Sequence, residues 1–505
     1  MPLLNSVINW LNVKRIYQIE LFGKHPREIQ QEVFSELINM ASDTEWGRKY
    51  KYAEIGSVIE YQQRVPLQTY EDIKPWVDRL REGEKDILWP GKVRWFAKSS
   101  GTTSDKSKFI PVTEEALKDC HFRGGKDVFA MYVKNHPGTN LICGKSLTLG
   151  GSTRINNFSN KSFYGDLSAI LIENVPFWTE FIRIPPPRIA LIEEFEEKLE
   201  KIIDATINEN VTSMAGVPSW YLVLLKKVLE KTGKKNILEV WPKLELFIHG
   251  GVNFEPYREQ FKELIPSPNM NYMETYNASE GFFALQDNPS TSDMLLMLDI
   301  GVFYEFIPMS EWGSENPRVL TLSEVEVEEN YAMVISTNGG LWRYIIGDTV
   351  KFTSKYPYKI RITGRTKHFI NAFGEEVIVD NAEQALKIAC ERTGAIVHEY
   401  TAGPIFMGAE NKGAHQWIIE FQKRPSSPEQ FVSCLDNALK MLNSDYEAKR
   451  HKNLTLEMPH LLSAPQGTFY KWMKSRGKIG GQNKIPRLSN DRQYLDQLLE
   501  LLDKK

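Results

Sequence analysis

A short hydroxyl-rich segment directly after an apolar run constrains this chain most. Residues 93–97 are apolar and read as a strand, and residues 99–104 then place five Ser or Thr side chains around Gly101. Hydroxyl and backbone N–H groups donate hydrogen bonds to phosphate oxygens, and Gly101 lets the backbone approach a ligand closely. Lys106 or Lys108 supplies positive charge nearby. The segment predicts a loop that wraps a polyphosphate, and an ordinary Ser/Thr-rich surface loop is the alternative.

Composition limits the class of protein. A length of 505 residues predicts two or more domains, and 42% hydrophobic residues supply an ample core. The formal net charge of −3 argues against a generic nucleic-acid binder. No uninterrupted apolar stretch reaches membrane-spanning length, and the four cysteines form no CxxC pair. We therefore expect a soluble cytoplasmic protein with buried thiols, no nucleic-acid partner and no integral membrane association.

Helical patterns alternate with short apolar runs along most of the chain. Residues 26–37, 193–209 and 220–229 carry apolar side chains at helical spacing, and the strand-like runs are 244–248, 294–298, 302–307 and 333–337. This alternation predicts an α/β fold with mixed β-sheets and helices in a large N-terminal domain, residues 1–366.

A smaller α+β unit is expected after residue 366. Helices are predicted at 381–391 and 428–442, and strands at 395–402, 417–422 and 454–458. We assign residues 367–505 to this small C-terminal domain.

Three further segments carry residues suited to nucleotide chemistry. In residues 272–281 an aromatic, a hydroxyl and the acid Glu280 share a tight turn and could stack a purine, contact a phosphate and hold Mg²⁺. Asp348 follows a glycine at the end of an apolar strand, where a carboxylate can bind ribose hydroxyls. Lys484 stands in a glycine-rich loop. Taken singly, these residues could be a helix cap or ion-pair partner, a hairpin turn and a solvated lysine.

In order, these segments resemble the adenylate-forming superfamily, which includes acyl-CoA synthetases, nonribosomal peptide adenylation domains and luciferases. The carriers are SSGTT, TYNASEG, YIIGDTV, GRTKHFINAFGEEV and the late lysine loop. Within that superfamily, the KFIP spacing, the WRY segment before Gly-Asp, residues 43–50 and the QNKIPR ending are similar to the auxin-responsive acyl acid amido synthetases. The resemblance spans nearly the whole chain.

The resemblance implies an enzyme that uses ATP and Mg²⁺ to adenylate a carboxylic acid and then transfers the acyl group to an amino acid. The implied phosphate-binding residues are Ser99, Ser100, Gly101, Thr102, Thr103 and Lys108. The implied AMP-binding residues are Gly250, Gly251, Tyr276, Asn277, Ser279, Asp348 and Arg365. Glu280 would bind the metal ion, Lys484 would act in adenylation as a mobile point charge, and Lys367 would be the domain hinge.

Two other functions stay open. An acyl-CoA ligase or another adenylate-forming ligase shares the first half-reaction, and a catalytically silent nucleotide-binding regulator could keep the fold alone. Aromatic side chains between residues 147 and 187 favour an aryl or otherwise bulky acid, although they could equally form core. The sequence names neither the acid nor the amino acid.

Overall fold

The computed structural model describes most of the chain, and its residues fall into two compact units. The described residues are 13–99, 108–149, 156–159, 162–175, 182–192, 195–251, 254, 257–366, 369–370, 372, 375, 377–406, 413–443, 446–447, 450, 456–478, 484–489 and 491–503. The large unit comprises Met1–Val252, Gln260–Ile346 and Val350–Arg361. The small unit comprises Asn253–Glu259, Gly347–Thr349 and Ile362–Lys505. Two short segments therefore group with the small unit although the chain on either side of them belongs to the large one.

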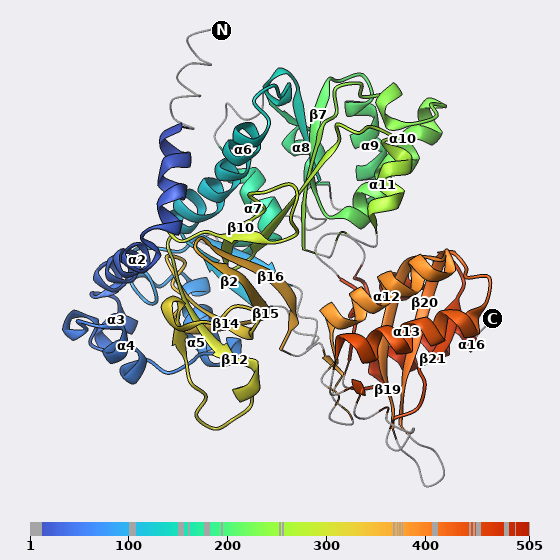
Figure 1. The fold of residues 1–505 in the computed structure, drawn as a ribbon. Coiled ribbons are helices and arrows are strands. Elements are labelled where there is room, and N and C mark those ends of the chain that lie inside the picture. The colour runs from blue at the N-terminus through green and yellow to red at the C-terminus, as the bar shows by residue number, and fades with distance from the viewer. Residues whose placement is uncertain are drawn as a thin grey trace. The chain divides into compact units, whose positions relative to one another are not determined.

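Several helices lie near the start of the large unit (Figure 1). They are α2 Pro26–Ala41, α3 Glu45–Lys49, α4 Val58–Arg64 and α5 Tyr70–Glu82. The Thr44 hydroxyl accepts a hydrogen bond from the Gly47 N–H at 3.0 Å, and Thr69 forms a capping box with Asp72 at the start of α5. The apolar stripe predicted from Pro26 onward is confirmed, because Val33, Phe34 and Leu37 are buried.

The hydroxyl-rich segment joins two paired strands. These are β1 Trp95–Ser99 and β2 Lys108–Val112, which run antiparallel with Ser99 opposite Lys108. Strand β1 also pairs in parallel with β5 Ser162–Gly165, and β4 Asn156–Ser159 completes a small sheet in the order β2-β1-β5-β4. The predicted strand before the loop is thus confirmed, and its register holds the two ends of the loop together.

The described residues also form one mixed sheet of twelve strands. In spatial order it contains β13 Leu320–Thr321, β12 Val302–Pro308, β14 Asn330–Thr337, β15 Tyr344–Lys355, β16 Tyr358–Arg365, β11 Met294–Leu296, β10 Gly281–Leu285, β9 Asn271–Ala278, β8 Leu246–Gly250, β7 Val211–Gly216, β3 Lys145–Thr148 and β6 Arg183–Ile184. The run from β9 to β6 is parallel, which places the carboxyl ends of its strands at one edge.

Further helices lie between the strands of these two sheets along the chain. They are the π-helix η3 Ala116–Phe122, α6 Arg123–Asn135, α7 Leu167–Asn174, α8 Pro187–Ala190, α9 Phe195–Thr206, α10 Pro218–Thr232 and α11 Arg258–Leu264. Helices α9 and α10 lie side by side (Figure 1). Leu199, Ile202 and Ile203 of α9 are buried, as their spacing predicts. The α/β architecture expected from the sequence is therefore confirmed.

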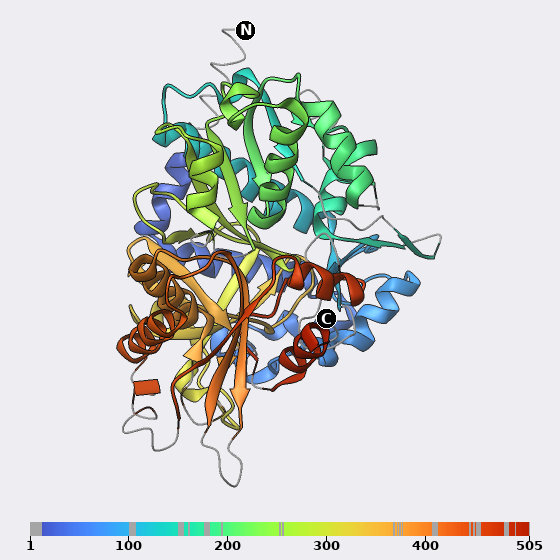
Figure 2. The ribbon, with the colours of Figure 1, turned by 90° about the vertical axis from the view of Figure 1, so that its right-hand side faces the viewer.

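The small unit is built on a three-stranded sheet with helices on both faces (Figure 2). Its main elements are β17 Phe369–Ile370, β18 Val377–Ile378, α12 Val379–Thr393, β19 Ile396–Ile405, β20 Ala414–Lys423, α13 Pro428–Leu442, β21 His460–Ala464, α15 Thr468–Ser475 and α16 Gln493–Asp503. Trp417 packs with α12 and α13, whereas its neighbour Ile418 packs with α15 and α16. This alternation is the period-two pattern of a strand with two covered faces.

One strand of the small unit is misplaced in the prediction. The third strand is β21, not residues 454–458, of which only 456–458 are described. Leu456 makes a single bridge to Gly413, and the chain then meets Pro459. Because proline cannot donate to a ladder, the strand begins after it, at His460.

The four cysteines form no disulfide, and only Cys120 is fully buried, so the expectation of buried thiols is correct for one of them. Cys143 is exposed, and Cys390 and Cys434 are partly exposed. Within the described ranges, no helix is long and apolar enough to cross a membrane.

A buried ion pair joins the amino-terminal helices to the large sheet. The guanidinium of Arg343 lies 3.2 Å from both carboxylate oxygens of Glu305, and its Nη1 donates to the carbonyls of Gln62 and Val65. The Arg343 side chain is 5% exposed and that of Glu305 is fully buried. Both charges are therefore paired and hydrogen-bonded, as buried charges require.

Replacing Arg343 by methionine should destabilise the fold strongly. The change leaves the Glu305 carboxylate buried without its cation, which typically costs about 3–5 kcal/mol. Arg318→Met is the matched control, because Arg318 pairs with Glu311 while 71% exposed. Urea unfolding monitored by tryptophan fluorescence measures both free energies of unfolding. Equal effects of the two substitutions would contradict a structural role for the buried pair.

Candidate active site

Only the ends of the predicted phosphate loop can be placed. Ser100, Gly101, Thr102 and Thr103 lie outside the described residues, and Ser99 is described as the last residue of β1. On the other side, the Lys108 ammonium lies 5.7 Å from the centre of the Tyr70 ring. The Tyr70 hydroxyl accepts a hydrogen bond of 2.8 Å from the Phe109 N–H. Tyr70, from α5, thereby fixes the strand end at which the chain leaves the loop.

The predicted glycine pair ends β8. Gly250 stands opposite Thr275 of β9, and a Cβ atom at Gly250 would lie 2.4 Å from the Thr275 carbonyl oxygen. Gly251 has φ of +80°, a backbone conformation that favours glycine. Close packing at one residue and backbone conformation at the next explain why both positions are glycine.

The hairpin between β9 and β10 carries the TYNASEG segment. Tyr276 is 5% exposed and packs edge-on against Phe283 at 4.9 Å, within the core. Asn277 is exposed, Ser279 is buried, and Glu280 is partly exposed in the turn. The structure therefore brings the predicted residues of this segment onto one hairpin. The roles of Tyr276 in adenine binding and of Ser279 in phosphate binding stay predictions.

A buried histidine contacts this hairpin from the π-helix η3. His121 Nδ1 lies 3.1 Å from the Asn277 Oδ1 atom. Burial lowers the pKa of His121 to about 4, so the ring is neutral at physiological pH. Beside it, the Phe282 N–H donates to the sulfur of Cys120, and a Cβ at Gly124 would lie 2.4 Å from the Phe282 ring. Single π-helical turns are frequent at functional sites. Here the π-helix contacts the hairpin through His121 and Cys120.

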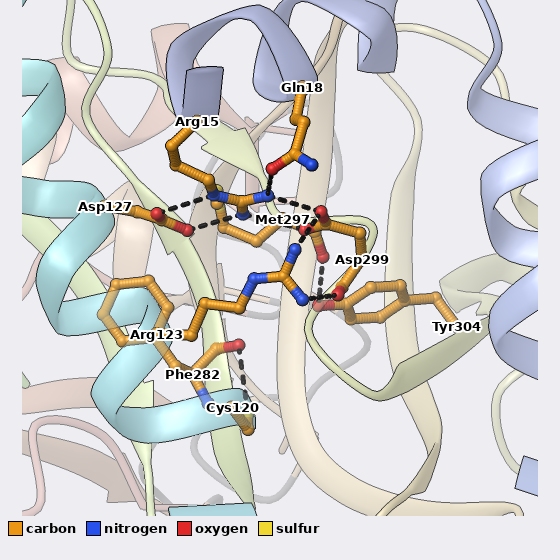
Figure 3. A network of polar contacts seen from close by, with 9 residues as sticks. All are labelled: Arg15, Gln18, Cys120, Arg123, Asp127, Phe282, Met297, Asp299 and Tyr304. Atoms are coloured by element: carbon orange, nitrogen blue, oxygen red, sulfur yellow. Dashed lines mark hydrogen bonds and ion pairs between the residues drawn. The ribbon is translucent and has the colours of Figure 1, made fainter. Parts of the chain in front are cut away.

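A network of two arginines and two aspartates holds α6, the helix that directly follows η3 (Figure 3). Arg15, in the helical residues 13–20, donates to Asp127 of α6 at 2.6 and 2.7 Å and to Asp299 at 2.5 and 2.9 Å. Arg123 donates to Asp299 Oδ2 at 2.7 Å and to its carbonyl oxygen at 3.0 Å. Burial raises the pKa of Asp127 against the opposing effect of Arg15. The network ties the helical residues 13–20 to α6, which begins directly after the π-helix that holds His121.

A second group of predicted residues converges in the small unit. Arg365 Nε lies 2.8 Å from Asp348 Oδ1, and Lys484 is close enough to both side chains for their charges to act on it. The Asp348 side chain is 8% exposed, whereas that of Arg365 is 42% exposed. Asp348 and Lys484 are far apart in sequence, so only folding brings them together. The predicted ribose ligand and the predicted catalytic lysine thus share one site.

The backbone holds Asp348 and Arg365 opposite each other. The Thr366 N–H donates to the Gly347 carbonyl at 2.9 Å, and the Thr363 hydroxyl donates to that of Thr349 at 2.9 Å. Gly347 has φ of +89°, which explains the glycine before the aspartate. Two neighbouring strands therefore position the ion pair.

The environment of Lys484 disfavours its charged, ammonium form. Burial and the positive charge of Arg365 lower the pKa of Lys484 to about 8, while Asp348 acts in the opposite direction. A lysine with its pKa near neutrality in a polar site is a candidate functional residue. Its ammonium form would bring positive charge to an anionic substrate.

Three residues near the predicted ones were not predicted for any role. His121, Tyr70 and Arg487 contact predicted residues or neighbour them, yet no local pattern distinguishes a buried histidine or tyrosine from core. Arg487 follows Lys484 by three positions, and that proximity is the only available signal. The predicted hinge, Lys367, lies outside the described residues.

The reactivity of Lys484 toward an amine-modifying reagent should reveal this environment. Because only the neutral amine reacts, its labelling should reach half-maximum near pH 8. Asp348→Asn should move that midpoint down, since it removes a negative charge that favours the ammonium form, and Arg365→Met should move it up. Mass spectrometry of peptides labelled across a pH series measures the midpoint, with the exposed Lys471 of α15 as internal reference. Unshifted midpoints in both variants would show that Asp348 and Arg365 do not act on the pKa of Lys484.

Comparison with known proteins places these groups in context. The chain is 22% identical to the indole-3-acetic acid-amido synthetase GH3.4 of Arabidopsis thaliana, over 98% of this chain and 94% of that protein. Its fold is similar to the AtGH3.15 acyl acid amido synthetase in complex with 2,4-DB, with a TM-score of 0.80, 17% identity and coverage of 96% and 95%. It is also similar in fold to a 2-hydroxyisobutyryl-CoA ligase in complex with 2-HIB-AMP, with a TM-score of 0.62, 11% identity and coverage of 94% and 92%.

Family models match in three consecutive parts. The GH3 family N-terminal domain matches residues 15–270, the central domain residues 295–365 and the C-terminal domain residues 380–493. The first of these alone spans more than half of the chain. These matches confirm the resemblance expected from the motifs, and the fold likeness confirms the predicted adenylate-forming architecture. The chain belongs to the GH3 family.

Proposed function

We propose that this protein is an ATP-dependent acyl acid amido synthetase, which joins a carboxylic acid to the amine of an amino acid. The observation that carries the proposal is the convergence of Asp348, Arg365 and Lys484 in one site. Membership of the GH3 family and the names of its relatives give the reaction class. ATP use follows from the same likeness to adenylate-forming ligases.

The reaction has two steps. A carboxylate oxygen of the acid attacks the α-phosphorus of ATP, and the bond to pyrophosphate breaks, which gives an acyl-adenylate. The amine nitrogen of the amino acid then attacks the acyl carbon, loses a proton, and displaces AMP. The first step brings two anions together, so positive charge at the reacting oxygens lowers its barrier. Lys484 in its ammonium form would supply that charge.

The other predicted residues would bind the nucleotide. Asp348 would accept hydrogen bonds from the ribose hydroxyls, with Arg365 on the ribose or phosphate side. Gly250, Gly251 and the TYNASEG residues would bind the adenine and the α-phosphate, and Lys108 would assist at the pyrophosphate. Lys367 as hinge stays a prediction, as does a cytoplasmic location.

Glu280 fits a magnesium site of the kind that ATP brings with it. Magnesium is usually bound by one or two carboxylates together with substrate phosphates. Glu280 is a partly exposed carboxylate in a turn, next to Ser279. In the described part of the chain, no three His, Cys, Asp or Glu side chains cluster as a metal site of their own. Bound Mg²⁺ would neutralise phosphate charge.

The acid substrate is proposed to be an aryl or otherwise bulky acid. The named relatives carry indole-3-acetic acid or 2,4-DB in their descriptions. The aromatic side chains that suggested such an acid divide into two sets. Phe158 and Tyr164 stack at 4.2 Å and pack against the core, and the Phe163 ring lies 5.2 Å from that of Trp95. Phe177, Trp178 and Phe181 lie outside the described residues. The three described rings are therefore better explained as packing.

One experiment distinguishes this function from its alternatives. Pyrophosphate release is measured with pools of carboxylic acids and amino acids, with and without coenzyme A, and the products are analysed by mass spectrometry. An amide supports the proposal, a thioester identifies an acyl-CoA ligase, and binding of ATP without pyrophosphate release identifies a silent nucleotide-binding regulator.

Lys484→Ala should impair adenylation selectively. Loss of one preorganised charge at a transition state costs roughly 3 kcal/mol or more, which is at least about a hundredfold in rate. Amide formation from pre-made acyl-adenylate should be retained. Pyrophosphate exchange and amide formation are measured on the same preparation, with circular dichroism to verify the fold. Equal losses in both half-reactions would contradict a specific role of Lys484 in adenylation.

Asp348→Ala should raise the KM for ATP far more than the KM for the acid, because its carboxylate would contact only the ribose. Thr353→Ala is a matched control on the same strand, where Thr353 bonds to Asp293 at 2.9 Å. Steady-state kinetics with each substrate varied in turn measures both constants. An unchanged KM for ATP would show that Asp348 does not bind the ribose and has only a structural role in the strand.

A further inference from the structure

A buried cluster of ion pairs forms around Arg487, which follows Lys484 by three positions in the sequence. Arg487 Nη1 donates to Glu399 Oε2 and, at 3.2 Å, to the Tyr400 carbonyl oxygen. Its Nε atom lies 3.6 Å from Glu383 Oε1. Both carboxylates are buried, at 7% exposure for Glu383 and 9% for Glu399. One guanidinium is thus shared by two acids from α12 and β19.

Two tyrosines complete this group, which we name the Arg487 cluster: Arg487, Glu383, Glu399, Tyr257 and Tyr400. The Tyr257 hydroxyl donates to Glu399 Oε1 at 3.1 Å and accepts from Arg487 Nη2 at 3.3 Å. The Tyr400 hydroxyl donates to Glu383 Oε1 at 2.9 Å, and its ring centre lies 4.7 Å from the guanidinium carbon. Every member belongs to the small unit.

The backbone around Arg487 is fixed as firmly as its side chain. The Ala402 N–H donates to the Arg487 carbonyl at 2.8 Å, and the Ser489 N–H donates to the Ala402 carbonyl at 3.0 Å. The Thr401 hydroxyl donates to the Pro486 carbonyl at 2.6 Å. Residues 486–489 therefore lie along the edge of β19, and Lys484 is two residues from this fixed backbone.

The composition of the cluster points away from a purely stabilising role. A buried ion pair usually contributes no more stability than apolar residues of the same volume, because desolvation offsets the attraction. Here burial raises the pKa of Glu383, and its Oε2 atom has no hydrogen-bond partner among the described residues. Buried charges do, however, permit only a narrow set of geometries. A cluster of this kind restricts where the chain can lie.

We propose that Arg487 is a positioning residue for Lys484, and that the Arg487 cluster holds the backbone from which the lysine reaches its substrate. The proposal rests on the proposed function of Lys484 in adenylation. Misplacing a reacting group by about 1 Å can cost on the order of a hundredfold in rate. The cluster matters for the half-reaction that uses Lys484 and not for the attack of the amine.

Tyr257 is the member of the cluster that lies farthest from Arg487 in the sequence. It belongs to residues 253–259, which group with the small unit although the preceding residues, up to Val252, belong to the large unit. The hydroxyl is the polar group of this side chain, and it bonds to both Glu399 and Arg487. Tyr257→Phe therefore loosens the cluster without creating a cavity.

The test compares half-reactions in three variants and one control. The variants are Arg487→Lys, which keeps the charge but loses the planar fork, Glu399→Gln and Tyr257→Phe. Arg492→Lys is the control, because Arg492 donates to the Pro404 carbonyl and to Gln416, both at 2.9 Å, outside the cluster. Each variant should lower kcat for pyrophosphate exchange by about tenfold to a hundredfold. The KM for ATP, and amide formation from pre-made acyl-adenylate, should stay within about twofold of wild type, and so should every value for the control.

A second readout needs no catalysis. In pH-dependent amine labelling, Arg487→Met should move the midpoint of Lys484 upward, since Arg487 is one of the positive groups acting on it, while Arg487→Lys should leave it nearly unchanged. The titratable or charged groups acting on Lys484 are Arg365, Asp348 and Arg487. The exposed Lys471 again serves as reference.

The outcomes separate the two proposals. Equal losses in both half-reactions, no loss in Tyr257→Phe and Glu399→Gln, or the same loss in Arg492→Lys would overturn the positioning role. If Arg487 variants fail to fold, Tyr257→Phe decides alone, because it removes one hydroxyl. If the wild-type protein makes no acyl-adenylate from any acid, the proposed function fails. Independently of that result, an unchanged labelling midpoint of Lys484 in a folded Arg487→Met protein would overturn the link between Arg487 and Lys484.

Discussion

The guanidinium of Arg343 is the interaction on which the central architecture depends. It satisfies both oxygens of the buried Glu305 and the carbonyls that end α4, at Gln62 and Val65. Arg343 has φ of +44°, which is uncommon for a residue with a side chain, and this conformation turns the chain into β15. Five residues later that strand carries Asp348. A buried charge in the large unit thus sets the start of the strand that supplies the predicted ribose ligand.

Burial of charge is used differently around Lys484. At Arg343 the carboxylate and the guanidinium are matched, so the pair has a single arrangement and no free charge. Around Lys484 the positive groups Arg365 and Arg487 face a lysine whose burial already disfavours its ammonium. The result is a lysine able to change its protonation near neutral pH. Burying such a group lowers the stability of the fold, and a lysine of this kind suits chemistry at an anionic centre.

Much of the site could be predicted because its residues lie in short motifs. The hydroxyl-rich segment, the TYNASEG hairpin and the Gly-Asp strand each contain several candidate residues within about ten positions, so local pattern and resemblance predict them together. The residues that were missed have no such neighbours. His121 reaches Asn277 from a π-helix, and Tyr257 reaches Arg487 from a segment that follows β8. Neither contact leaves a periodic or compositional trace, because it joins residues distant in sequence.

The sequence by itself determined the order of helices and strands, the glycine positions of the site and the family. These depend on local physical chemistry: apolar spacing sets the element type, and a glycine marks either a positive φ, as at Gly251, or a close approach, as at Gly250. Tertiary structure alone decided that Asp348, Arg365 and Lys484 meet, and that residues 253–259 and 347–349 group with the small unit. The strength of a charge depends on its burial and its neighbours in space, and these exist only after the chain has folded.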